Sequence, residues 1–160
     1  MSGSPGPKGD VGSPAAQSWA STPAVRRSMQ GNRGRDTKPE VAVRRLVHAA
    51  GLRYRVDFRP LTSLNRRADM VFPRLKIAVF IDGCFWHGCP EHHTVARSNA
   101  DYWAAKVARN RERDCHTDQV LESGGWLVLR AWEHEPADEV AQRVINAVRA
   151  RRSDALSRRV

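Results

Sequence analysis

The sequence lacks any apolar run of about 18 residues, the length that a membrane-spanning helix requires. Its N-terminus also lacks the apolar core of a signal peptide, so we expect a cytoplasmic protein without a membrane partner. Only 3 of the 160 residues are cysteines. A small, odd number of cysteines disfavours a disulfide framework and favours metal binding or free thiols.

Acidic residues are scarce relative to basic ones. The chain has 17 Asp and Glu against 27 Lys and Arg, which gives a formal net charge of +10. Such an excess is typical of nucleic-acid-binding proteins, although a basic soluble protein without a special partner is the alternative. We expect a disordered Gly-, Ser- and Pro-rich tail at 1–24, a basic arm at 25–36, one folded domain at 37–150 and a basic tail at 151–160.

The spacing of the apolar residues predicts an α/β domain with the order helix, three strands, helix, strand, helix. The first helix begins at Thr37 and ends at Gly51, a long helix runs from Asn99 to Gly124, and the last covers about 138–150. Strands are predicted at 53–58, 69–72, 77–81 and 126–132. Because the third strand is apolar throughout, we expect it in the interior of a mixed sheet with helices on its faces.

The loop after the third strand is the most informative segment, because it combines metal-ligand side chains with two large aromatic ones. It reads Asp82-Gly-Cys-Phe-Trp-His-Gly-Cys-Pro-Glu-His-His93. Cys84, Cys89 and His92 are spaced like ligands of tetrahedral zinc, and we expect His134 as the fourth. The alternatives for the fourth ligand are His93, Cys115 and His116. A closed site of this kind would be structural; buried unliganded cysteines with surface histidines are the other interpretation.

Phe85 and Trp86 lie between the expected metal ligands. A neighbouring pair of aromatic residues usually belongs to the core of a protein. Here the ligands would restrict the loop, so that both rings cannot easily turn inward. Exposed rings on a basic protein can stack on bases or wedge between base pairs.

Acidic side chains at strand ends offer a second site. Asp69 begins the second strand and Asp82 ends the third, where carboxylates can hold Mg²⁺ and a scissile phosphate. His87 could transfer a proton. Glu40 and Asp114 have structural alternatives: Glu40 fits the capping box of the first helix, and Asp114 fits a solvated helix face.

Several segments between residues 26 and 135 form a combination whose order is highly specific. They are Thr37-x-Pro-Glu40 with Val43-Arg-Arg-Leu46, Arg67-Ala-Asp69-Met-Val-Phe72, Val79 through His92, Tyr102-Trp-x-x-Lys106, Asn110-x-Glu-Arg-Asp114 and Gly125-Trp126 through Trp132-Glu133. With them the chain resembles the very short patch repair endonucleases. The resemblance implies a restriction-endonuclease-like fold, a mixed sheet flanked by helices with a structural zinc loop, for the domain at 37–150.

The resemblance also implies roles for individual residues. Asp69 would be the principal Mg²⁺ ligand, His87 the general acid or base, and Glu40 a carboxylate that assists through water or metal. Ile81 would offer its backbone carbonyl to Mg²⁺, because the hydroxyl that some members carry at this position is absent. Asp114 matches a position near the catalytic histidine.

The remaining implied roles concern zinc and DNA. Zinc would be held by Cys84, Cys89, His92 and His134, and the DNA wedge would consist of Phe85 and Trp86, with Met29 joining from the arm. The substrate would be double-stranded DNA with a T:G mismatch, such as deamination of 5-methylcytosine leaves. A T:G pair is stacked less favourably than a Watson–Crick pair, so a wedge can discriminate before any base edge is read.

The resemblance leads us to expect a monomer with a functional link to a DNA cytosine methyltransferase and to mismatch-repair factors. Two alternatives stay open. One is a related nuclease that recognises other damage or other sequences, and the other is a non-catalytic zinc-containing DNA-binding module. The simultaneous presence of Asp69, His87 and Glu40 favours an enzyme.

Overall fold

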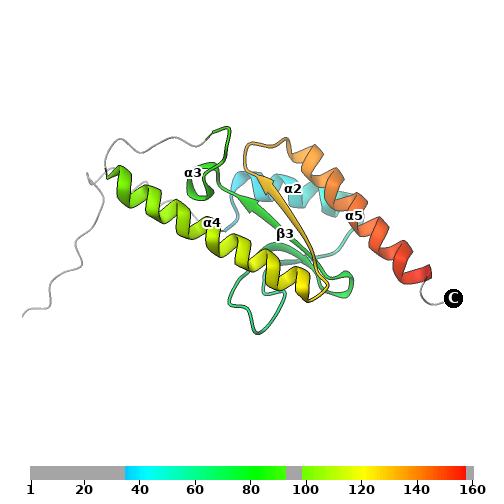
Figure 1. Cartoon of the computed structure of the whole chain (residues 1–160). Coiled ribbons are helices and arrows are strands. Elements are labelled where there is room, and N and C mark those ends of the chain that lie inside the picture. Colours follow the sequence, from blue (N-terminus) through cyan, green and yellow to red (C-terminus); the bar gives the residue numbers. More distant parts are fainter. Residues whose placement is uncertain (1–34, 93–98, 158–160) are drawn as a thin grey trace, which may run out of the picture. The chain divides into compact units, whose positions relative to one another are not determined.

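A four-stranded mixed sheet forms the centre of the computed structural model, which describes residues 35–92 and 99–157 (Figure 1). The strands are β1 (Arg55–Phe58), β2 (Ala68–Phe72), β3 (Ile77–Asp82) and β4 (Leu127–Trp132), and they lie side by side in this order. β1 pairs antiparallel with β2 and β2 with β3, whereas β3 and β4 are parallel. The predicted mixed sheet is confirmed, and β3 is an interior strand as its apolar sequence predicts.

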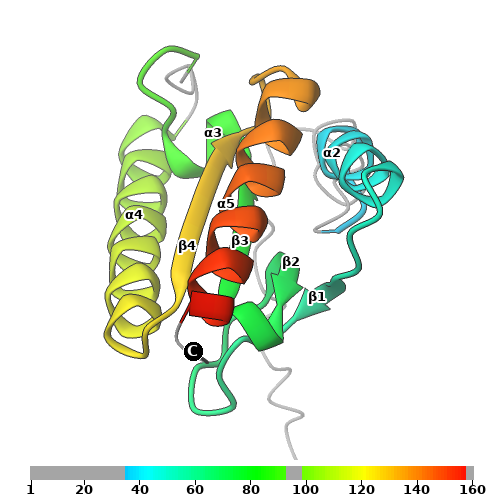
Figure 2. The ribbon, with the colours of Figure 1, turned by 90° about the vertical axis from the view of Figure 1, so that its right-hand side faces the viewer.

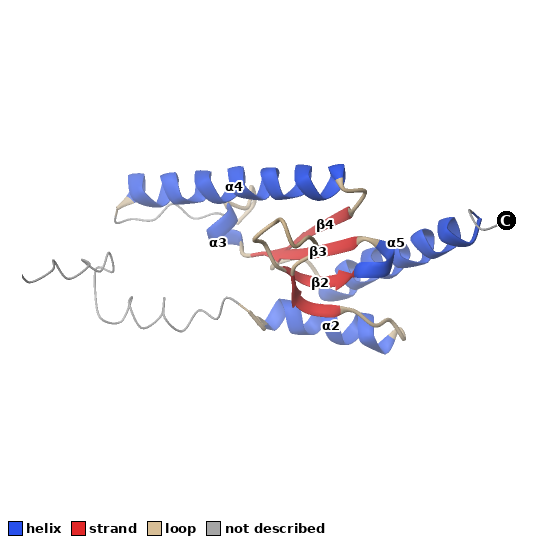
Figure 3. Ribbon diagram, turned by 90° about the horizontal axis from the view of Figure 1, so that it is seen from below, coloured by secondary structure: helices blue, strands red, loops and turns tan. Residues whose placement is uncertain are grey.

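Helices cover both faces of the sheet (Figure 3). The helices α2 (Lys38–Ala49) and α5 (Ala137–Ser157) pack on one face, and α4 (Ala100–Ser123) packs on the other, as the rotated view in Figure 2 also shows. Because successive side chains of a strand point to opposite faces, Met70 and Val79 join the core under α2 and α5, whereas Val71 and Ala78 join the core under α4. The sheet is therefore buried on both sides.

The parallel pair β3–β4 determines where chemistry can occur. Parallel strands need a long crossover, which α4 supplies between β3 and β4. The register pairs Ile77 with Leu127 and Asp82 with Trp132. Both strands therefore end at the same edge of the sheet, and the segments that follow them are brought together there.

Two helices start where the sequence predicts, but neither is capped by the predicted side chain. Thr37 precedes α2, yet its side chain caps no backbone N–H; its hydroxyl donates to Glu40 Oε1 (2.8 Å) instead. The reciprocal capping box is therefore not formed. Asn99 precedes α4 with a φ of 55° and also makes no side-chain cap. The predicted stop of the first helix is confirmed, since Gly51 follows it with a φ of +81°, a conformation that favours glycine.

Some predicted boundaries need correction. The first strand begins at Arg55 rather than residue 53, and α5 continues to Ser157, so that most of the expected tail at 151–160 is helical. The loop after β3 begins with a helical turn, α3 (Cys84–His87), and a 3₁₀ turn, η1 (Pro73–Leu75), joins β2 to β3. The tail at 1–24 and nearly all of the arm at 25–36 lie outside the described residues. Within the described ranges, none of the helices combines the length and the apolar character that a membrane crossing demands.

Candidate active site

Asp69 lies on β2 beside the carboxyl end of β3. The backbone N–H of Ile81 donates a hydrogen bond to Asp69 Oδ2 (2.6 Å). Burial, together with the charges of Glu40 and Asp82, raises the pKa of Asp69 to about 7 against the lowering effect of the Ile81 hydrogen bond. A carboxylate in this environment is ready to accept a cation, which would stabilise its charged form. The structure also places the Ile81 backbone directly next to this carboxylate.

Glu40 is held close to the first residues of α2. The residue is 5% exposed, and its carboxylate accepts hydrogen bonds from the Asp36 backbone N–H (2.9 Å) and from the Thr37 hydroxyl (2.8 Å). Arg44 Nη2 lies 3.6 Å from Glu40 Oε2. Both carboxylate oxygens therefore have structural partners, although the charge of Glu40 reaches Asp69 and raises its pKa.

His87 ends the helical turn α3 and faces two carboxylates. Its Nδ1 lies 2.5 Å from Asp114 Oδ2 and 3.7 Å from Asp82 Oδ1. Burial alone would lower the pKa of His87, but the hydrogen bond to Asp114 and the charge of Asp82 raise it overall. Burial pushes the pKa of Asp114 upward, yet the contact with His87 lowers it. With Nδ1 hydrogen-bonded to Asp114, Nε2 is the ring atom that can exchange a proton.

A partly buried ion network lies next to His87. Arg130 Nη1 donates to both oxygens of Asp82 (3.0 and 2.8 Å), and Arg130 Nε lies 2.9 Å from Asp118 Oδ2. The Asp82 side chain would be costly to bury alone, and burial raises its pKa even though Arg130 opposes the shift. Arg130 therefore fixes Asp82 on one side of the His87 ring while α4 fixes Asp114.

Arg130→Met should lower the free energy of unfolding by on the order of 2–3 kcal/mol, because it leaves the buried Asp82 carboxylate without its ion partner. The loss is below that of a fully buried pair because the Arg130 side chain is 23% exposed. Urea denaturation measures it. Arg143→Met is the matched control: its pair with Glu135 is 51% exposed on the arginine side, so removing it should cost less than about 1 kcal/mol. Equal losses in the two variants would show that the network contributes no more than a surface pair.

Two cysteines and two histidines meet beyond the ends of β3 and β4. Cys84 Sγ lies 3.1 Å from His134 Nδ1, and Cys89 Sγ lies 3.7 Å from His134 Nδ1 and 4.0 Å from His92 Nδ1. The ligand atoms of the four residues are all within 4.8 Å of one another. Four ligands about 2.0–2.3 Å from a central ion would have such separations, so the set fits tetrahedral zinc.

The thiol chemistry agrees with a metal site. Burial and the neighbouring Cys89 thiol raise the pKa of Cys84 to about 11. Without a cation the thiol would therefore stay protonated, whereas a bound metal ion would favour its deprotonation. The Cys84 backbone N–H also donates to Glu133 Oε1 (2.7 Å), which ties this loop to the residue after β4.

The loop rests directly on α4. Gly88 has a φ of +64°, and a Cβ at this position would come within 2.7 Å of Val107 Cγ1. Arg111 donates to the backbone carbonyls of His87 and Gly88. Asn110 Nδ2 donates to the Trp86 carbonyl (2.7 Å). Only glycine permits this close approach without displacing the side chains of Val107 and Arg111, and α4 thereby positions the histidine and the candidate metal ligands together.

Phe85 and Trp86 form an aromatic cluster with Trp103 of α4. The ring centroids are 5.2 to 5.7 Å apart, and the rings meet edge to face. Lys106 Nζ lies over the rings of Trp86 (5.2 Å) and Trp103 (5.3 Å). Phe85 and Trp86 are half-buried rather than fully exposed, because they pack against Trp103 as well as facing solvent.

The predicted site residues thus divide into those that meet and those that do not. The structure brings His87 to Asp114, places the Ile81 backbone beside Asp69, and groups Cys84, Cys89, His92 and His134. Cys115 and His116, the alternative zinc ligands, are exposed on α4 and belong to no such group among the described residues. Asp69 is likewise in neither cluster of three or more metal-binding side chains within those residues; the second cluster is Asp82, His87 and Asp114. Met29 and His93 lie outside the described part of the chain.

Sequence reasoning missed Arg130, the ion partner of Asp82. A charged residue inside the apolar segment Trp126-Leu-Val-Leu-Arg-Ala-Trp132 was the available signal, since a buried charge needs a partner. It also missed the cap that Glu133 gives to Cys84, and nothing local in the sequence indicates that contact.

Comparison with known proteins points to a family of nucleases. Residues 20–94 match the family described as DNA mismatch endonuclease Vsr. The chain is 45% identical over 124 residues to the type II nicking enzyme V.NaeI of Lentzea aerocolonigenes, covering 76% of this chain and 75% of that one. It is 37% identical over 134 residues to V.NmeDIP of Neisseria meningitidis serogroup C (80% and 88%), and 35% identical over 103 residues to DNA mismatch endonuclease Vsr of Escherichia coli K12 (62% of each chain).

Proposed function

The chain belongs to the Vsr family of nicking endonucleases, and we propose from this premise that it cuts one strand of duplex DNA beside the thymine of a T:G mismatch. The observation that carries the proposal is that two pairs, Asp69 with the Ile81 backbone and His87 with Asp114, both lie near the carboxyl end of β3. A carboxylate that can hold a metal and a group that can transfer a proton are what phosphodiester hydrolysis requires. We further assign the mixed sheet to the restriction-endonuclease-like class.

In the proposed mechanism, Asp69 and the Ile81 carbonyl would hold Mg²⁺, and Glu40 would assist from the start of α2. Bound there, Mg²⁺ would stabilise the negative charge that builds up on the scissile phosphate. His87 transfers the proton through Nε2, while Asp114 keeps Nδ1 occupied and the ring oriented. Arg130 supplies positive charge to Asp82 and Asp114, so we interpret the Asp82–His87–Asp114 group as an oriented histidine rather than a second cation site.

The cysteine–histidine group is proposed to bind a structural zinc ion. All four positions would be taken by protein ligands, which leaves none for a substrate. Its proposed effect is to fix the segment that follows β3, whose described residues 83–92 bury few apolar side chains besides the two cysteines. This segment carries both His87 and the aromatic pair, so the metal would position catalysis and recognition at once.

Recognition of the mismatch is proposed to use the aromatic cluster of Phe85, Trp86 and Trp103. Its rings are half-buried and edge to face, so they keep their orientation while one side remains open to solvent. Rings held in this way can enter a base step that is already weakly stacked. The excess of basic side chains would provide the general attraction to DNA. Met29 is proposed to join from the arm.

A second candidate is a Vsr-family nicking enzyme that recognises another lesion or sequence. The relatives with 45% and 37% identity are named type II nicking enzymes, whereas the relative named mismatch endonuclease is 35% identical. A role in very short patch repair, with links to a cytosine methyltransferase and to mismatch-repair factors, is therefore a finer proposal than nicking itself.

A nicking assay separates these candidates. Purified protein is incubated with matched and T:G duplexes in many flanking sequences, with Mg²⁺ or with EDTA. We expect Mg²⁺-dependent cleavage of one strand, confined to T:G duplexes. Cleavage of matched duplexes at a fixed sequence would favour the second candidate. Binding without cleavage would indicate a non-catalytic DNA-binding module.

Trp86→Ala should weaken the preference for T:G over matched duplex about 5- to 150-fold, since base–aromatic stacking contributes roughly 1–3 kcal/mol per base. Nonspecific affinity should change little, because it comes mainly from Lys and Arg at phosphates. Binding to both duplexes at two salt concentrations measures the two effects. Trp86→Phe keeps a ring and should retain most of the preference. If the folded, zinc-loaded Trp86→Ala variant discriminates as well as the parent, the ring is only a packing residue.

A further inference from the structure

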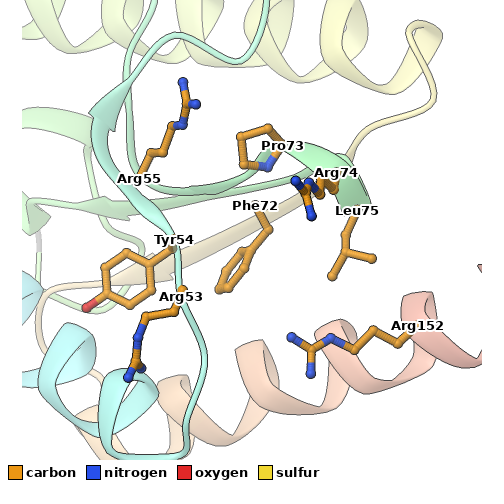
Figure 4. A pocket seen from close by; sticks show the side chains of 8 residues that line it. All are labelled: Arg53, Tyr54, Arg55, Phe72, Pro73, Arg74, Leu75 and Arg152. Carbon is orange, nitrogen blue, oxygen red and sulfur yellow. The ribbon is translucent and has the colours of Figure 1, made fainter.

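A cavity surrounded by arginines lies at the other end of the sheet. It has a volume of about 540 Å³ and is lined by Arg53, Tyr54, Arg55, Phe72, Pro73, Arg74, Leu75 and Arg152 (Figure 4). No acidic residue is among these side chains. Asp69 and Phe72 are three steps apart on β2, which corresponds to about 10 Å at the usual rise of a strand. The cavity is thus separate from the candidate active site.

The positive charge of this cavity is unbalanced. Within residues 35–92 and 99–157, the side chains of Arg74 and Arg152 have neither an ion pair nor a hydrogen bond. Arg53 donates only to backbone carbonyls, at 3.2 Å to that of Leu52, and Arg55 lies over the Phe58 ring at 4.6 Å. By contrast, the arginines at 35, 44, 67, 130 and 143 all pair with carboxylates. The exposed side chains of Arg53, Arg74 and Arg152 thus line one cavity without a carboxylate among its lining residues, and an anion bound there would reduce the repulsion between their charges.

We infer that this arginine cavity, defined by Arg53, Arg74 and Arg152, binds a phosphate group. Guanidinium groups donate in forked pairs that match phosphate oxygens. The donors come from three elements, the segment before β1, the turn η1 and the helix α5. This arrangement suits a tetrahedral anion, whose oxygens point in several directions, better than a carboxylate, whose two oxygens lie in one plane. Figure 4 shows Arg53 and Arg152 on opposite sides of the Phe72 ring.

The phosphate can come from two sources. One is the backbone of the bound duplex, outside the nicked step. The other is free phosphate, as the inorganic ion or on a nucleotide, which a cavity of this size can hold. With the first source, the protein would contact DNA beyond the candidate active site. With the second, binding of a soluble anion would stabilise the folded protein.

The test uses the full-length chain and two double variants of equal charge. Arg74→Gln with Arg152→Gln removes the two unpaired guanidinium groups of the arginine cavity. Arg59→Gln with Arg149→Gln is the matched control, because both residues are exposed, outside the cavity and without an ion pair among the described residues. Duplex affinity is measured over a series of salt concentrations, and the melting temperature is measured over a series of inorganic phosphate concentrations.

If duplex DNA supplies the phosphate, the cavity variant should reduce the slope of log K against log salt by about 1 to 2, equally for matched and T:G duplexes. If free phosphate is the ligand, the parent's Tm should rise by about 3–6 °C at ten times Kd, and the cavity variant should lose this rise. The control variant should keep both properties. An unchanged slope together with an unchanged phosphate response, or equal effects in the two variants, would overturn the inference and leave an acidic protein segment as the alternative occupant.

These outcomes are independent of the proposed nicking function. At saturating DNA the cavity variant should nick at the parental rate, because none of its substitutions touches Asp69 or His87. If the parent shows no Mg²⁺-dependent nicking, the proposed function is contradicted. The salt dependence and the phosphate response would still test the arginine cavity.

Discussion

Replacing Asp69 by asparagine should lower the rate of Mg²⁺-dependent nicking by on the order of 10³-fold or more, about 4 kcal/mol in the activation free energy. Asparagine keeps an oxygen that can accept the hydrogen bond from the Ile81 N–H, so the β2–β3 pairing should survive. It removes the negative charge that Mg²⁺ would need. Burial has already raised the pKa of Asp69 to about 7, so the neutral side chain should be tolerated. Single-turnover nicking of a T:G duplex measures the loss.

The binding affinity of the same variant separates catalysis from recognition. Affinity for the T:G duplex should stay nearly unchanged, because Asp69 is proposed to hold a metal and not to contact a base. Asp154→Asn is the matched control: Asp154 is exposed near the C-terminal end of α5, outside the candidate active site, and its replacement should leave nicking intact. Substantial nicking by the Asp69 variant would place the active site elsewhere, and an equal loss in the Asp154 variant would indicate an effect unrelated to the site.

Replacing Cys89 by serine should abolish the proposed zinc binding and lower the free energy of unfolding by on the order of 3 kcal/mol or more, because the energy of binding at a structural site is folding energy. Cys89 is fully buried, so a side chain from the surface cannot easily take its place as a ligand. Metal content of the purified protein and urea denaturation measure the two effects. Nicking should fall with the zinc content, since His87 lies in the same loop between the ligands.

Cys115 provides the control for this experiment. It is an exposed cysteine on α4 and lies outside the metal-ligand group. Cys115→Ser should keep one zinc per chain and change stability by no more than about 0.5 kcal/mol. A parent protein that contains no zinc and whose three thiols all react freely would contradict the proposed metal site.

The sequence was informative about the fold wherever a local pattern reflects burial. The continuous apolar segment from Ile77 to Ile81 predicts an interior strand, and β3 is one. Gly51 predicts the end of the first helix, because few other residues adopt a positive φ there. The end of α5 could not be predicted, since Arg151 and Arg152 are compatible with either a helix or a solvated tail. The predicted cap at Thr37 is not formed because the Thr37 hydroxyl donates to Glu40 Oε1 instead of accepting from a backbone N–H.

The candidate site was predictable to different degrees. The spacing of Cys84, Cys89 and His92 indicates a metal site on its own, because ligands near in sequence are near in space. His134 and Asp114 come from other elements, and their meeting with the loop depends on the parallel register of β4 and on the position of α4. The ion pairs of Arg130 depend on the same packing. These contacts are consequences of tertiary structure that single-sequence periodicity does not contain.

The parallel pairing of β3 with β4 has a consequence for the order of folding. Cys84 and His134 are separated by 50 positions and meet only after the crossover through α4 has been completed. Closing so long a connection is a late and slow event compared with forming a local turn. The proposed zinc ion would therefore not nucleate this chain in the way that zinc nucleates a small metal-dependent domain; it would lock a sheet that has already assembled. When zinc is limiting in a cell, the expected product is a less stable sheet with an open loop after β3, so metal supply would set how much of the protein is active as well as how stable its fold is.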